Sequence, residues 1–194
     1  MKVVAVSQRV DAFPERNEMR DALDQRLTTF LLLASYLPVP VPNELGEAIH
    51  DWLAAVQPAA VLLSGGNDIG ERPERDAIER TLLDHARDHQ IPVLGICRGM
   101  QMMAHWAGVN LHPVKGHVRT RHQLSGEIAD VVNSYHTFSL DGCPEDFDVL
   151  TRSEDGEIES IRHQFLPWEG WMWHPEREPE FARRDLERMR RLFQ

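Results

Sequence analysis

One short segment constrains the fold of this chain more than any other. The residues Gly95-Ile96-Cys97-Arg98-Gly99 follow the apolar run at 92–96 and precede a helical pattern at 98–107 that Gly108 closes. Together they predict a buried strand, a sharp turn at Cys97 and a helix. Small residues on either side of the turn allow strand and helix to pack closely, so the Cys97 side chain is expected to project above a sheet edge.

The position of Cys97 at the start of a helix gives its sulfur a particular chemistry. Backbone amides and the positive end of the helix dipole favour a thiolate, which is the nucleophilic form of cysteine. The amide of the next residue, Arg98, is then placed to donate to an oxyanion. The alternative is an inert buried thiol between two glycines, but the strand–turn–helix context favours the nucleophile.

A cysteine nucleophile needs a base, and His174 in the segment Trp173-His174-Pro175-Glu176 is the best candidate. It follows an apolar stretch at 170–173 that predicts a strand, and Pro175 stiffens the turn after it. Glu176, two positions on, is placed to return to the imidazole and fix its tautomer. Alternatively, these residues begin a helix and Glu176 only complements the helix dipole.

A glycine-containing loop follows another apolar run. Residues 59–63 predict a buried strand, and Ser64-Gly65-Gly66-Asn67-Asp68 comes directly after it. Glycines allow the backbone to approach a ligand closely and to turn amides toward it. We expect the Gly66 amide to be a second oxyanion donor; the alternative is an ordinary strand-to-helix turn.

The rest of the chain alternates apolar runs with helical patterns. Strands are expected at 3–6, 59–63 and 92–96, with a short edge strand around Val39 and Val41. Helices are expected at 21–36, at 43–56 with Asn43 as cap, at 73–90, at 98–107 and at 178–193. Shorter, partly antiparallel strands are expected within 109–161. Such alternation is typical of an α/β fold with a parallel sheet.

Composition excludes several classes of protein. The 194 residues carry a net charge of −10, whereas a general nucleic-acid-binding protein needs a basic surface. Two cysteines, Cys97 and Cys143, are too few for a disulfide scaffold. The longest apolar run, 30–37, is shorter than the roughly 20 residues of a membrane helix, and the first residues lack a signal-peptide core. We therefore expect a cytoplasmic protein with no membrane segment and no nucleic-acid partner.

Ten histidines raise the question of a metal site. His112, His117 and His122 lie close in the sequence, but no His-x-x-x-His helix pattern or cysteine partner accompanies them, so no metal is expected. His117, Arg119, Arg121 and His122 either lie near a phosphate-bearing part of a substrate or form a solvated strand face. All but two of the 21 basic residues are arginines, which recognise phosphate and carboxylate well.

Four motifs in order carry a family resemblance: LSGGND, GICRGMQ, VNSYH and WHPERE. They resemble the class I (triad) glutamine amidotransferase superfamily, and within it the γ-glutamyl hydrolase branch that includes the γ-glutamyl-γ-aminobutyrate hydrolases. The segments SQRVD, DALDQR and RDAIE, the last at 75–79, fit the same branch. The resemblance covers nearly the whole chain and implies one domain over 1–194. It also implies a flavodoxin-like doubly wound, mostly parallel sheet flanked by helices, with a small antiparallel extension.

The resemblance implies a role for each site residue. Cys97 would be the nucleophile, His174 the base and acid, and Glu176 the third member of the triad. The oxyanion would be held by the amides of Gly66 and Arg98. The glutamyl group would be bound by Gly65, Gln101, Ser134, Tyr135 and His136, in the last three largely through backbone. No metal and no organic cofactor is implied.

The substrate is a matter of leaving group. The chain is short for the γ-glutamyl-γ-aminobutyrate hydrolases, and the segment 101–134 is trimmed. Its compact length resembles a sub-branch that cleaves a nucleotide-linked γ-glutamyl amidate in surface-polysaccharide phosphoramidate assembly. We therefore expect a small-molecule γ-glutamyl amide, either that amidate or γ-glutamyl-γ-aminobutyrate. The alternatives are a glutaminase subunit that delivers ammonia to a synthase partner, and a non-catalytic regulatory module. Self-association into a homo-oligomer is compatible with each of these.

Overall fold

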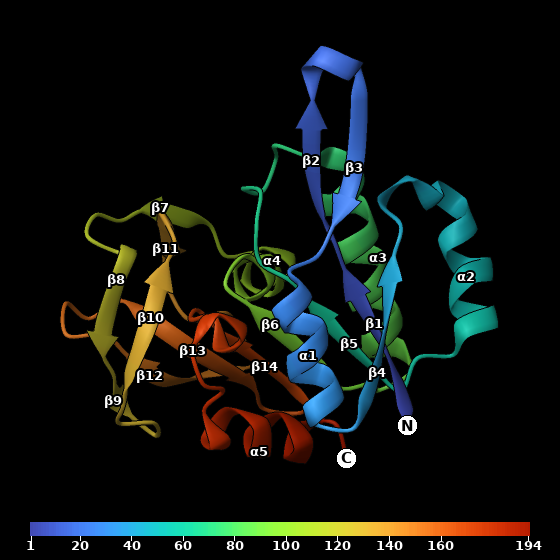
Figure 1. Cartoon of the computed structure of the whole chain (residues 1–194). Coiled ribbons are helices and arrows are strands. Elements are labelled where there is room, and N and C mark those ends of the chain that lie inside the picture. The colour runs from blue at the N-terminus through green and yellow to red at the C-terminus, as the bar shows by residue number, and fades with distance from the viewer.

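The computed structural model describes residues 1–194, and an eight-stranded sheet forms its centre, in the order β4-β1-β5-β6-β14-β13-β12-β9 (Figure 1). The five strands from β4 to β14 run parallel, and the last three are antiparallel to their neighbours. Their bounds are β4 (Tyr36–Val41), β1 (Lys2–Ser7), β5 (Ala60–Leu63), β6 (Val93–Ile96), β14 (Trp168–Trp171), β13 (Ile158–His163), β12 (Phe147–Arg152) and β9 (Ser125–Gly126).

The parallel part of the sheet is doubly wound. From β1 the chain passes outward to β4 and then returns to β5 on the other side of β1. In such sheets ligands bind beyond the carboxyl ends of the strands, at the point where the winding reverses. Ser7, Ser64 and Cys97 lie at those ends, on β1 and directly after β5 and β6. The expected flavodoxin-like sheet with an antiparallel extension is confirmed.

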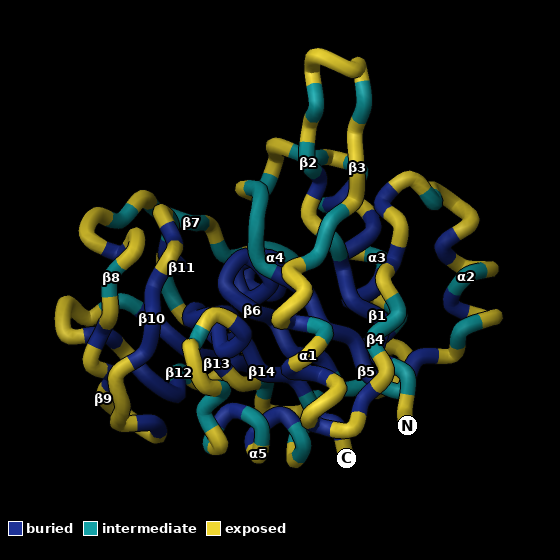
Figure 2. The backbone as a smooth tube through the Cα atoms, viewed as in Figure 1, coloured by how far each residue is buried: buried dark blue, intermediate teal, exposed yellow.

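Helices cover both faces of this sheet (Figure 1). One face carries α1 (Gln25–Leu33) and α5 (Arg183–Leu192), and the other carries α2 (Ile49–Val56), α3 (Pro73–Asp88) and α4 (Arg98–Trp106). Because successive strand residues point to opposite faces, Val61 and Leu63 enter the core beneath α2, α3 and α4, while Leu62 enters the core beneath α1 and α5. Figure 2 shows the central strands buried on both sides, which explains their continuous apolar runs.

Two expectations near the N-terminus are wrong. The helix expected at 21–36 begins at Gln25, where the Asp24 side chain caps it by accepting the Arg26 amide at 2.8 Å. The residues before it form a projecting hairpin of β2 (Arg9–Phe13) and β3 (Glu18–Ala22) (Figure 1). Asn43 does not cap a helix: its side-chain amide donates to the Asp21 carboxylate at 2.7 Å, and a 3-10 helix over Asn43–Ala48 precedes α2.

The edge strand is confirmed as β4. Pro38 and Pro40 stand opposite Val4 and Val6 of β1. Alternate residues of a strand direct their amides to the same side, so both missing donors face away from β1, as proline requires at a sheet edge.

The second half of the chain contains the expected short antiparallel strands. β8 (Val118–Gln123) pairs with β10 (Val131–Tyr135), and β7 (Leu111–Pro113) pairs with β11 (Phe138–Leu140). The final helix, α5, begins at Arg183 rather than at 178, because Glu178 is extended before Pro179, as a residue preceding proline prefers.

No helix in the structure combines the length and the apolar character that a membrane crossing demands.

Candidate active site

The turn at Cys97 has the geometry that the sequence predicts. Cys97 sits between β6 and α4 with φ 50° and ψ −105°, a conformation that side chains rarely adopt. Its amide donates to the Trp171 carbonyl of β14 at 2.7 Å. A Cβ on Gly99 would lie 2.2 Å from the Leu63 carbonyl oxygen, and one on Gly95 would lie 2.6 Å from the backbone of Gly99. Both glycines are therefore required for α4 to start directly against the sheet.

His174 and Glu176 meet directly after β14. The Nδ1 atom of His174 lies 2.6 Å from Glu176 Oε1, and both side chains are buried. A short 3-10 helix over Pro175–Arg177 turns the chain so that Glu176 faces back toward the imidazole. The expected return of Glu176 to His174 is confirmed, and it leaves Nε2 as the ring nitrogen available to the thiol.

Surrounding residues fix His174 in place. Asn133 of β10 accepts the His174 amide at 2.9 Å and donates to the His174 carbonyl at 2.8 Å. Arg26 of α1 donates to the Glu176 carbonyl at 2.8 Å. A Cβ on Gly65 would lie 2.6 Å from Cε1 of His174, so only glycine leaves room for the ring there.

The electrostatics of this group favour a charged imidazole. Burial alone would lower the pKa of His174, but the charge of a thiolate at Cys97 and the Glu176 carboxylate outweigh it and raise the pKa to about 9. At neutral pH the arrangement is therefore an imidazolium held between two anions.

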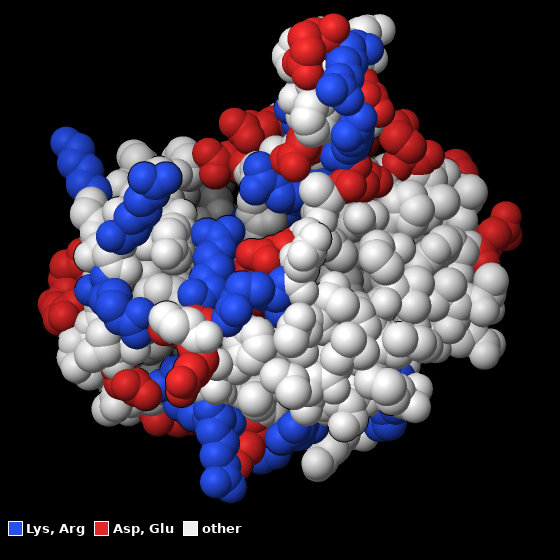
Figure 3. All heavy atoms as spheres, viewed as in Figure 1, with Lys and Arg blue, Asp and Glu red and all other residues white.

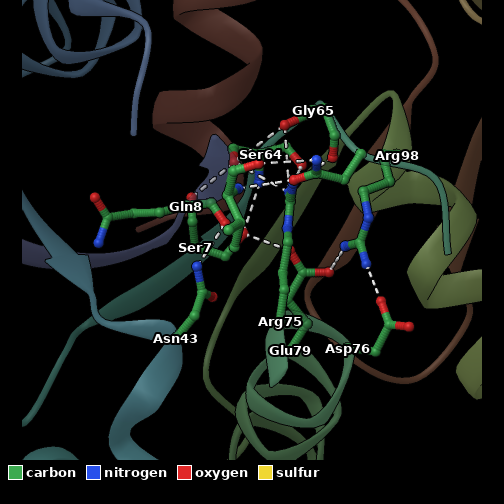
Figure 4. Close-up of polar contacts among 12 residues, drawn as sticks. Ser7, Gln8, Asn43, Ser64, Gly65, Arg75, Asp76, Glu79 and Arg98 are labelled. Carbon is green, nitrogen blue, oxygen red and sulfur yellow. Dashed lines mark hydrogen bonds and ion pairs between the residues drawn. The ribbon is translucent and has the colours of Figure 1, made fainter. Parts of the chain in front are cut away.

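A buried arginine shapes the loop after β5, as Figure 4 shows. Arg75 of α3 donates to the Ser64 carbonyl at 2.6 Å, to the Gly65 carbonyl at 3.3 Å and to the Gly66 carbonyl. In a trans peptide the N–H points opposite to the C=O, so the Gly66 amide points away from Arg75. That amide makes no backbone hydrogen bond, and Gly66 adopts a φ of 92°.

The same network ties this loop to the turn at Cys97. Glu79 accepts from Arg75 at 2.9 Å and from the Ser7 hydroxyl at 2.7 Å, and it also pairs with Arg98. The Arg98 guanidinium is buried on Glu79 and Asp76, so its side chain faces α3 rather than the cavity. Its amide belongs to the first turn of α4, where no intrahelical acceptor exists.

The residues expected to bind the glutamyl group occupy different surroundings. Gln101 donates to the Phe138 carbonyl at 2.9 Å and lines a cavity of about 320 Å³. The Ser134 hydroxyl donates to the His117 carbonyl at 2.7 Å and is buried. Tyr135 is exposed, and its ring meets that of His174 edge-on at 5.8 Å. The His136 ring is buried and turned away from solvent, which leaves only its backbone for a substrate.

A second cavity, of about 250 Å³, lies beside the imidazole. His174, Glu176 and Gly65 line it together with Arg9 of the hairpin and Arg177. Figure 3 shows a hollow below the hairpin with basic side chains gathered around it. The Arg177 guanidinium also stacks over the Tyr135 ring at 4.7 Å.

The histidines and arginines around β8 do not form the phosphate-facing group considered above. His117 and His122 are buried, so neither belongs to a solvated strand face nor meets a substrate from solvent. Arg119 and Arg121 are exposed, and Arg121 pairs with Glu178 at 3.1 Å. Trp171 and Trp173 stack at 5.4 Å within the core, as expected for packing residues.

Sequence reasoning gave no structural role to Arg75, Glu79 or Asn133. Each lies in a segment that contributed to the family resemblance, RDAIE or VNSYH. Their contacts join α3 to the loop after β5 and β10 to the chain after β14, and nothing local in the sequence announces such pairs.

Fold and site together define the class of protein. The family model "Glutamine amidotransferase class-I" matches residues 21–189, and the chain belongs to this family. It is 31% identical over 185 residues to the gamma-glutamyl-CDP-amidate hydrolase of Campylobacter jejuni subsp. jejuni serotype O:2, covering 90% of each chain.

Other relatives are synthase components. The glutamine-hydrolyzing subunit of the GMP synthase from Methanothrix thermoacetophila is 32% identical over 129 residues, covering 61% of this chain and 71% of that protein. A crystal structure of a Thermoplasma acidophilum protein described as a GMP synthase subunit superposes with a TM-score of 0.76 at 20% identity. It covers 100% of this chain and 92% of that one, and it shows the shared fold.

Proposed function

We propose that the chain is a cysteine-dependent hydrolase of γ-glutamyl amides. The observation that carries this proposal is the arrangement of Cys97, His174 and Glu176: a cysteine on a strained turn beside an imidazole whose pKa is raised to about 9. A thiolate paired with an imidazolium supplies both a nucleophile and an acid. Glu176 holds the ring in the required tautomer.

The proposed reaction proceeds through a thioester. The Cys97 thiolate attacks the γ-carbonyl carbon, and the amides of Gly66 and Arg98 donate to the resulting oxyanion; losing one such donor typically costs about 10²–10³ in rate. Nε2 of His174 gives its proton to the leaving nitrogen as the carbon–nitrogen bond breaks. Neutral His174 then accepts a proton from water, which attacks the thioester and releases glutamate and the thiolate.

For the leaving group we propose a nucleotide-linked amidate. The relative with this activity in its name aligns over 90% of both chains. The cavity beside His174 contains Arg9 and Arg177, and guanidinium groups bind phosphate oxygens in pairs. γ-Glutamyl-γ-aminobutyrate, which carries one carboxylate in place of a diphosphate, would use these cations less fully.

A substrate panel tests this proposal. Glutamate release is measured with the CDP-linked γ-glutamyl amidate, γ-glutamyl-γ-aminobutyrate, γ-glutamyl polyamines and glutamine. We expect the highest kcat/KM for the amidate, and a selective loss of that preference in Arg9→Gln and Arg177→Gln. Arg183→Gln, which removes an arginine whose side chain is 91% exposed, is the matched control. Equal kcat/KM for all four, or a preference unchanged in both cavity variants, would contradict this choice of leaving group.

A second candidate function is a glutaminase that passes ammonia to a synthase partner. The similarity to glutamine-hydrolyzing components of GMP synthases, which covers 61% of this chain for the Methanothrix protein, favours it. Glutaminase turnover that stays near background until a co-purifying synthase is added would support this second function. Rapid turnover of an amidate by the isolated chain would support the hydrolase.

A further inference from the structure

A cluster of four titratable side chains lies outside the proposed active site. His117, His122, His136 and Glu159 are all buried, and one nitrogen or oxygen from each lies within 4.8 Å of those of the other three. They come from residues beside or within β8, β10 and β13, so the cluster joins the β8–β10 ribbon to the central sheet. The reaction proposed above uses none of these side chains.

A β-bulge brings the two histidines of the first ribbon strand together. Tyr135 pairs with Val118 whereas Ser134 pairs with Thr120, which leaves Arg119 as an extra residue with a φ of 55°. Residues five apart normally point to opposite sides of a strand, but one bulged residue restores the same side. The spacing of His117 and His122 therefore becomes that of two ligands on one face.

Outer hydrogen bonds fix the tautomers of two of these rings. Nδ1 of His136 lies 2.9 Å from the Phe138 carbonyl, which only accepts, so this nitrogen carries the proton. Nε2 of His117 lies 2.8 Å from the Asp155 carboxylate and carries the proton there. In neutral rings, the inner nitrogens are then lone pairs, and they face each other at 3.2 Å with no proton between them.

The remaining two groups are equally unsatisfied. Neither oxygen of the fully buried Glu159 carboxylate has a hydrogen-bond donor, although Oε1 lies 3.3 Å from His136 Nε2. Nε2 of His122 is buried without a partner. Burying an unpaired carboxylate costs several kcal/mol, so a site of this kind requires a cation. A divalent ion would satisfy all four groups at once.

We propose that His117, His122, His136 and Glu159 bind a structural Zn²⁺ ion. Tetrahedral zinc with bonds of about 2.0–2.1 Å places its ligand atoms about 3.3 Å apart. Here His117 Nδ1 lies 3.2 Å from His136 Nε2 and 3.8 Å from Glu159 Oε1, and the third distance is 3.3 Å. Imidazole and carboxylate ligands suit zinc, and four buried protein ligands describe a closed site rather than a catalytic one.

The outer hydrogen bonds are also those of a zinc site. Metal-binding histidines usually donate their second N–H to a carboxylate or a backbone carbonyl, as His117 and His136 do toward Asp155 and Phe138. The ion would tie β10 to β13 near Asn133, the residue that holds the His174 backbone. This assignment replaces the expectation of no metal, which rested on helix and cysteine patterns that three strands do not follow.

Metal analysis of tag-free protein tests the proposal without any activity measurement. A Cys97→Ser background removes the active-site thiol as a competing ligand. We expect about one zinc per chain after gel filtration, and a large loss in Glu159→Gln and in His122→Ala. His112→Ala is the matched control, because this half-buried histidine also lies between two carboxylates, at 3.1 and 3.2 Å, and should keep its zinc.

Cobalt spectroscopy covers the case in which the ligand variants do not fold. Protein stripped by a chelator and titrated with Co²⁺ should give the visible bands of a tetrahedral site, saturating near one equivalent, and its Tm should rise on addition of Zn²⁺. A chain that holds no zinc and gives no tetrahedral cobalt spectrum would overturn the proposal and leave a protonated histidine–glutamate cluster. Zinc retained in Glu159→Gln and His122→Ala, or lost equally in His112→Ala, would also overturn it.

Discussion

Replacing Glu176 by glutamine removes one negative charge from beside His174 while keeping the size of the side chain. In the native chain Glu176 Oε1 lies 2.6 Å from Nδ1, and both groups are buried. A hydrogen bond to a charged group contributes about 1.5–3 kcal/mol. If that contribution is needed to stabilise the imidazolium during catalysis, its loss reduces kcat/KM about 10- to 150-fold.

The pH dependence gives a sharper signature than the rate. His174 must be protonated to act as the acid, so activity falls as pH rises through its pKa, which is about 9 in the native chain. Loss of the Glu176 charge lowers that pKa, and the alkaline limb of the kcat/KM profile moves to lower pH in Glu176→Gln. The assay is glutamate release from the preferred γ-glutamyl substrate across pH 6 to 10 (about this range suffices to include both limbs).

The matched control is Glu180→Gln, which removes a carboxylate from an exposed position four residues along. It should leave both the rate and the alkaline limb unchanged. A Glu176→Gln chain with native turnover and an unmoved alkaline limb would refute the role assigned to the Glu176–His174 pair.

Three further outcomes are expected. Gly65→Ala places a Cβ 2.6 Å from His174 Cε1 and should lower kcat about 100-fold through a misplaced ring, whereas Gly142→Ala, with open space around it, should not; equal rates would contradict this. Arg75→Lys cannot reproduce the bonds to three carbonyls and should lower the free energy of unfolding by about 3–5 kcal/mol in denaturant titrations; an unchanged midpoint would count against the network. Because the pKa of His174 rises from 6.5 to about 9 on folding, its contribution to stability is complete below pH 6.5 and is lost as pH rises through 9, so the native chain should lose more stability over that interval than His174→Gln.

Local patterns predicted the parts of the fold that depend on local packing. The turn at Cys97 was predictable because a buried strand, two glycines and a helix start follow one another without interruption. The return of Glu176 to His174 was predictable for the same reason, since the two residues are two positions apart. The hairpin of β2 and β3 was not, because β3 is mostly exposed and lacks the apolar alternation that marks a strand.

Contacts between distant segments account for the rest. Arg75 acquires its role only when α3 packs beside the loop after β5, and Asn133 only when β10 lies against the chain after β14. The zinc ligands proposed here were hidden twice, first by the bulge at Arg119, which changes the side to which His117 points, and then by Glu159, which lies on another sheet. Sequence spacing alone carries neither the bulge nor the pairing of strands.

The central claim is that Cys97 is a nucleophile activated by His174, and covalent labelling tests it most directly. The chain is treated at neutral pH with a glutamine-mimicking electrophile, and the intact mass and the modified peptide are determined. We predict a single adduct on Cys97, none on the exposed Cys143, and a much slower reaction in His174→Gln. An unlabelled Cys97, or labelling at the same rate in His174→Gln, would contradict the account.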